Sequence, residues 1–150
     1  MEFYLPSEAA QLDCGRALAE RLRGRTGVVF LRGDLGAGKT TLVRGLLRAL
    51  GHLGSVRSPT YTLIEPYEVG DQRIHHLDLY RLGDPEELEY LGLRDLLDGE
   101  GLVLVEWPER GAGMLPEPEL VIEIEHAPPG RRLRLSPGAA WAPLFQVPFC

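Results

Sequence analysis

The sequence predicts a three-layer α/β/α fold with a mostly parallel central sheet and antiparallel hairpin additions. Residues 28–31 and 102–105 are short, wholly apolar runs, as expected for parallel strands that are buried on both faces. The first run leads into a glycine-rich loop, Gly33 to Thr40 with sequence GDLGAGKT, and apolar residues at helical spacing follow the loop. This order of strand, loop and helix is that of a phosphate-binding P-loop, so the predicted fold is P-loop NTPase-like.

The elements around the loop are marked by local signals. Ser7 is a suitable N-cap for a helix over residues 8–23. Five apolar residues between positions 42 and 50 repeat at helical spacing after the loop, and Gly51 ends that helix.

The rest of the chain predicts strands with short helical connections. Asp84 followed by a proline is a helix start, and that helix is expected to end near Gly92 with one short turn after it, around residues 95–97. The strand over 102–105 ends at Glu106. Two hairpins are expected, one from residues 60–67 with 73–79 and one from 120–125 with 131–135.

Composition limits the class of protein. The chain of 150 residues fits one domain, assigned to residues 1–135 and followed by a tail over 136–150 that either covers apolar surface or is disordered; its aromatic residues favour the first. The net charge of −6 argues against strong autonomous nucleic-acid binding. No signal peptide and no apolar run long enough for a membrane span are visible.

Cys14 and Cys150 are far apart in sequence and lack metal-ligand spacing. A reduced, cytoplasmic protein without membrane contact is therefore the simplest expectation.

Lys39 is the only lysine among 16 basic residues, and it occupies the lysine position of the G-x-x-x-x-G-K-[ST] motif. A compact ammonium reaches the β and γ phosphate oxygens between backbone amides, where a wider guanidinium does not fit equally well. Asparagine is absent, so the N-K-x-D element that selects guanine in many GTPases cannot occur. The motif therefore predicts a nucleoside triphosphate site that prefers adenine or reads the base loosely.

The hydroxyl of Thr40 is expected to contact Mg²⁺ bound to the phosphates. A carboxylate at the end of a neighbouring strand is expected to complete the metal site, because ligands collect at that edge of an open α/β sheet. Glu106 and Asp78 both follow predicted strands, and their roles are interchangeable from the sequence. Thr60 lies shortly after the P-loop helix, where nucleotide switches often sense the γ-phosphate.

No role in the site is predicted for the histidine and tryptophan residues that lie near Asp78 and Glu106 in the sequence. His75 and His76 are adjacent and so point to opposite faces of a strand, which disfavours shared metal ligation. Trp107 follows a buried strand and is interpreted as a core residue.

Five segments together resemble the bacterial TsaE (YjeE) family. They are GDLGAGKTT from Gly33, SPTYTL from Ser58, HLDLYRL from His76, DPEELE from Asp84 and VEWPE from Val105. The likeness extends over about residues 5–135, and the tail lies outside it.

The resemblance implies an ATPase, weak when alone, that acts with Mg²⁺ in the N6-threonylcarbamoyladenosine modification of tRNA. It further implies binding to the TsaD–TsaB complex, which is supplied with threonylcarbamoyl-adenylate by TsaC. The family pattern places the attacking water near Asp78, the metal on Thr40 and Glu106, the switch at Thr60 and the base beside Arg131. The residues that it assigns to the phosphates are Leu35, Gly36, Ala37, Gly38, Lys39, Thr40 and Thr41.

Two other functions fit a P-loop. A small-molecule kinase shares the strand–loop–helix opening, but the region after Leu82 is acidic and shows no arginine-rich lid. A nucleotide-gated adaptor would bind ATP and a partner without meaningful turnover.

Overall fold

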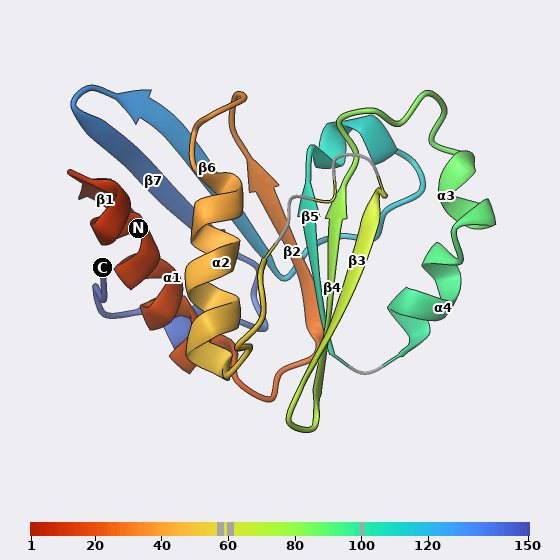
Figure 1. Ribbon diagram of the computed structural model, residues 1–150, viewed down its shortest axis with the longest axis horizontal. Helices are drawn as coiled ribbons and strands as arrows, with labels where there is room; N and C mark the ends of the chain where they lie inside the picture. The colour runs from red at the N-terminus through yellow and green to blue at the C-terminus, as the bar shows by residue number, and fades with distance from the viewer. Residues whose placement is uncertain (57–58, 60–61, 100) are drawn as a thin grey trace.

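A computed structural model describes residues 1–56, 59, 62–99 and 101–150 of the chain. Within these residues, seven strands form one sheet (Figure 1). The strands are β1 (Glu2–Leu5), β2 (Gly27–Arg32), β3 (Ile64–Val69), β4 (Gln72–Asp78), β5 (Leu102–Glu106), β6 (Leu120–Ala127) and β7 (Gly130–Pro137).

The sheet has a parallel centre and antiparallel edges. Its strand order is β1-β7-β6-β2-β5-β4-β3. Strands β6, β2, β5 and β4 run parallel to one another, whereas β7 with β1 extends one side and β3 the other by antiparallel pairing. The predicted sheet, with its two hairpins, is therefore confirmed.

Helices cover both faces of the sheet. Helices α1 (Glu8–Leu22) and α2 (Lys39–Leu50) lie side by side on one face, and the short helices α3 (Glu87–Tyr90) and α4 (Leu93–Asp98) lie on the other (Figure 1). Alternate residues of β2 enter different cores. Val29 and Leu31 belong to the main core cluster under α1 and α2. Val28 and Phe30 belong to the second core cluster, which includes Leu88 of α3 and Leu93 of α4. Both faces of the central strands are thus buried, which is why their sequences are wholly apolar.

The pairing of α1 with α2 depends on two glycines. Ser7 caps α1 by accepting a hydrogen bond from the backbone N–H of Ala10 at 3.1 Å. A Cβ at Gly45 would collide with the carbonyl oxygen of Leu12 and lie 3.0 Å from its Cα, and a Cβ at Gly15 would collide with the backbone of α2. Because both positions lack a side chain, α1 and α2 approach closely. The packing of α1 thereby holds α2, the helix that begins at the P-loop, in place.

Four elements differ from the sequence-based expectation. Strand β1, which pairs with β7, was not predicted, since its four residues carry no clear local pattern. Leu63 has a positive φ of 66°, so β3 begins only at Ile64. The helix expected from Asp84 is short, because the first bonds of this segment span three residues rather than four, and the turn expected around 95–97 is helix α4.

The C-terminal tail folds back over α1. Trp141 and Phe145 are each 5% exposed and belong to the main core cluster, so the tail covers apolar surface. Cys150 forms a disulfide with Cys14 of α1, and the expectation of reduced cysteines is therefore wrong. The separation of 136 residues concealed this pair from sequence reasoning, and the cysteines no longer support a reducing environment.

Candidate nucleotide-binding site

The glycine-rich loop joins the carboxyl end of β2 to the first turn of α2. Gly38 is the N-cap of α2 and has a φ of 110°, which favours glycine. A Cβ at this position would also collide with the side-chain amide of Gln11 from α1. The first N–H groups of α2 have no partner within the helix and lie at the positive end of its dipole, which is an arrangement that binds anions.

Arg131 supports this loop from the neighbouring hairpin. Its guanidinium donates from Nε to the carbonyl oxygen of Ala37 at 3.1 Å and from Nη2 to that of Gly36 at 3.3 Å. A third hydrogen bond joins Nη1 to the carbonyl oxygen of Gly130 at 3.0 Å. The side chain therefore ties the phosphate-binding loop to β7. The position beside the base that the resemblance implies for Arg131 stays a prediction.

Lys39 extends along the same loop. Its ammonium donates to the carbonyl oxygens of Gly33 and Asp34, and Nζ lies 4.2 Å from the centroid of the Trp107 ring. Burial lowers the pKa of Lys39 below its ordinary value of 10.5, and nearby carboxylates, led by Glu106, oppose this shift. The charge of the loop is thus placed between backbone carbonyls, an aromatic face and an acidic wall.

The acidic wall is formed by the ends of two adjacent strands. Asp78 and Glu106 are direct register partners in β4 and β5 and are 4% and 3% exposed. Thr40 Oγ1 donates to Glu106 Oε2 at 3.2 Å, whereas Asp78 Oδ1 accepts from the backbone N–H of Tyr80 at 3.0 Å. The structure therefore brings together both carboxylates and the P-loop hydroxyl that the sequence selected.

Two residues near this wall were missed. His76 is fully buried, and its Nε2 lies 2.6 Å from Glu106 Oε2. His76 lies two residues before Asp78 on the same strand, so strand alternation already placed both on one face and was the usable signal. Trp107 is partly buried and packs against the second core cluster, as its interpretation as a core residue expected, but its ring also contacts Lys39 and the Tyr80 ring, whose centroid is 4.9 Å away.

A cavity of about 280 Å³ opens between these groups. Its lining contains hydroxyl and carboxylate oxygens, which Mg²⁺ prefers, and loop amides suited to phosphate. No group of three or more His, Cys, Asp or Glu able to hold a metal occurs within the described ranges. The donor set therefore fits an Mg²⁺ ion that arrives with phosphate oxygens and water rather than one caged by protein. The residues that line the cavity are Leu35, Gly36, Ala37, Gly38, Lys39, Thr40, Thr41, Asp78, Glu106 and Trp107.

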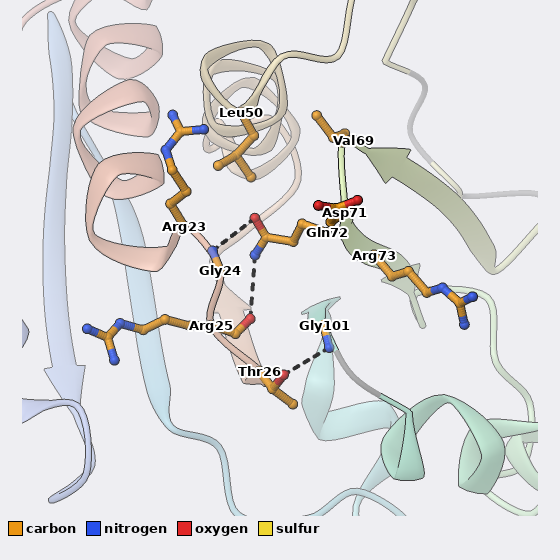
Figure 2. A pocket seen from close by; sticks show the side chains of 11 residues that line it. Arg23, Gly24, Arg25, Thr26, Leu50, Val69, Asp71, Gln72, Arg73 and Gly101 are labelled. Atoms are coloured by element: carbon orange, nitrogen blue, oxygen red, sulfur yellow. Dashed lines mark hydrogen bonds between the residues drawn. The ribbon is translucent and has the colours of Figure 1, made fainter.

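Two further cavities differ in their relation to the loop. One of about 350 Å³ lies directly beside it, lined by Gln11, Arg44 and Arg131 among others. The other, about 800 Å³, lies where β2 and β5 begin, at the edge opposite the P-loop. Figure 2 shows the guanidinium groups of Arg23, Arg25 and Arg73 pointing in different directions there. This cavity is larger than the one at the P-loop, but the positive charges of its arginines do not converge on one point.

Thr60, expected in a switch segment, lies outside the described residues. Along the stretches that the structure describes, no helix combines the length and apolar character needed to cross a membrane.

The fold and this site define a P-loop nucleotide-binding protein. A family profile described as "Threonylcarbamoyl adenosine biosynthesis protein TsaE" matches residues 5–133. The chain therefore belongs to the TsaE family of tRNA threonylcarbamoyladenosine biosynthesis proteins, as its motifs predicted.

Individual relatives agree with this assignment. The chain is 46% identical over 136 residues to the TsaE protein of Haemophilus influenzae, covering 88% of this chain and 86% of the relative. It is 39% identical over 126 residues to TsaE of Aquifex aeolicus, covering 83% and 86%. The crystal structure of Bacillus subtilis YdiB superposes with a TM-score of 0.80 at 28% identity, covering 96% of this chain and 90% of that one.

Proposed function

We propose that this protein binds and hydrolyses ATP with Mg²⁺ and acts on the TsaD–TsaB complex during N6-threonylcarbamoyladenosine formation on tRNA. The observation that carries the proposal is the meeting of Lys39 and Thr40 with the register pair of Asp78 and Glu106 at the carboxyl edge of the sheet. The TsaE family supplies the pathway. In this proposal TsaC takes part only through threonylcarbamoyl-adenylate, the product that it delivers to the TsaD–TsaB complex.

Each side chain has a distinct part in this reaction. Lys39 and the amides of the loop offset phosphate charge, and Arg131 holds the loop in shape. Thr40 and Glu106 provide the oxygen atoms toward the metal. Asp78 holds the attacking water beside Glu106. Bound Mg²⁺ would supply positive charge at the β and γ phosphate oxygens.

Hydrolysis by the isolated protein should be slow. Of the described residues that line the 280 Å³ cavity, Lys39 is the one cationic side chain. An arginine inserted by a partner stabilises the transition state of such reactions and raises rates by roughly 10³–10⁵. In this proposal the TsaD–TsaB complex controls the rate of hydrolysis, while this chain supplies the binding of ATP.

The test is ATP binding by calorimetry together with phosphate release, with and without TsaD–TsaB. Removal of the ammonium in Lys39→Ala should cost about 1.5–3 kcal/mol per charged contact, or roughly ten- to a hundredfold in ATP affinity. Glu106→Gln should abolish phosphate release in the presence of the complex. Glu123→Gln is the matched control, because Glu123 lies near the same sheet edge but pairs with Arg134 at 3.5 Å outside the cavity.

Wild-type affinity in Lys39→Ala would contradict the site. Stoichiometric phosphorylation of an added metabolite would instead indicate a kinase. ATP binding without stimulated phosphate release in the presence of TsaD–TsaB would indicate an adaptor.

A further inference from the structure

His76 of β4 makes a polar contact with Glu106 of the neighbouring strand β5. Its ring is fully buried in β4, and Nε2 lies 2.6 Å from Glu106 Oε2. Within the described residues, the ring's other nitrogen, Nδ1, is buried without a hydrogen-bond partner. Burial of a polar ring costs free energy that an apolar side chain of similar size would not. The contact with Glu106 is thus the one hydrogen bond found for this ring among those residues.

The direction of the hydrogen bond follows from chemistry. An ionised carboxylate only accepts, so Nε2 carries the hydrogen and donates it to Glu106. Thr40 donates to the same Oε2 atom at 3.2 Å. Two donors from different elements, β4 and α2, therefore converge on one oxygen and fix the rotation of the carboxylate.

This convergence also sets the orientation of the Thr40 hydroxyl. A hydroxyl has one hydrogen, and that of Thr40 is directed at Glu106. The oxygen of Thr40 consequently presents only lone pairs to other groups, which is the form that binds a cation. A carboxylate that rotated freely would not hold this arrangement.

We propose that His76 is a positioning residue that orients Glu106, and through it Thr40, for Mg²⁺ bound with the nucleotide. This inference rests on the proposed function. When a hydrogen-bond partner of a metal-ligating group is removed by mutation, the affinity for the metal typically falls 10–100-fold. The effect of losing His76 should therefore depend on Mg²⁺, whereas the contacts of the loop with phosphate should persist.

The experiment measures ATP affinity by calorimetry in EDTA and in Mg²⁺, together with the Mg²⁺ concentration at half-maximal enhancement of ATP affinity. His76→Leu keeps an apolar side chain of similar size and removes the donor. It should leave ATP affinity in EDTA within about twofold of wild type and raise the Mg²⁺ midpoint roughly 10–100-fold. His76→Gln, which can place an amide N–H near the position of Nε2, should restore most of the loss, whereas the shorter His76→Asn should not. His75→Leu is the matched control, because His75 points to the opposite face of β4.

The outcomes separate this inference from the proposal on which it rests. An unchanged Mg²⁺ midpoint in His76→Leu, or equal losses of affinity in EDTA and in Mg²⁺, would overturn the positioning role while leaving ATP binding intact. A wild-type protein with no Mg²⁺-dependent ATP binding would overturn both. If His76→Leu does not fold, equal Mg²⁺ midpoints in the Gln and Asn variants would overturn the positioning role, and restoration by Gln alone would support it.

Discussion

Reduction of the bond between Cys14 and Cys150 should destabilise the protein strongly, because this bond closes almost the whole chain into a loop. The two residues are 136 positions apart. A disulfide that closes a loop of this size stabilises the folded state by at most about 5 kcal/mol, because it restricts the unfolded chain. Loss of a native disulfide typically costs about 2–5 kcal/mol. For a domain of this length, that loss lowers the melting temperature by roughly 4–20 °C.

The native tail should respond only locally to reduction. Trp141 and Phe145 remain anchored by burial in the main core, so the last few residues lose only their covalent link to α1. The destabilisation should therefore arise mainly from the greater freedom of the unfolded chain.

The assay is urea unfolding with and without reductant, combined with a count of free thiols. The wild type should show no free thiols before reduction and two afterwards, with a lower urea midpoint. The double variant Cys14→Ser with Cys150→Ser should unfold at the lower midpoint under both conditions. Full reduction with an unchanged midpoint would refute the loop argument, and two free thiols in the untreated protein would refute the bond itself.

Two smaller perturbations test the packing of α1 on α2 and the protonation of His75 in β4. Gly45→Ala should lower the free energy of unfolding by up to about 2 kcal/mol, since overpacking against the Leu12 backbone costs about 1–3 kcal/mol and the gain in helix propensity offsets about 1 kcal/mol of it; stabilisation in urea would contradict the close approach. Burial, assisted by Arg73, lowers the pKa of His75 below 6.5, so the folded state resists protonation. The resulting stability is fully present above pH 6.5 and is lost as pH falls below it toward the folded pKa. His75→Gln should flatten this part of the pH profile, and identical profiles for the two proteins would exclude the effect.

The sequence by itself determined the parts of this protein that depend on neighbours along the chain. The apolar run before Gly33, the loop and the spacing of leucines after Thr40 predicted strand, P-loop and helix, because these patterns reflect local backbone conformation. Strand ends also selected Asp78 and Glu106, since the carboxyl ends of parallel strands share an edge. The same local reasoning was insufficient at Asp84, where an evident start signal preceded only a short helix.

Only the tertiary structure decided which distant groups meet. His76 reaches Glu106 because β4 and β5 are neighbours in the sheet. Arg131 reaches the P-loop through the hairpin of β6 and β7, and Cys150 reaches Cys14 because the tail crosses α1. Strand order and helix packing bring these groups together, and no pattern of period 2 or 3.6 along the chain contains that information.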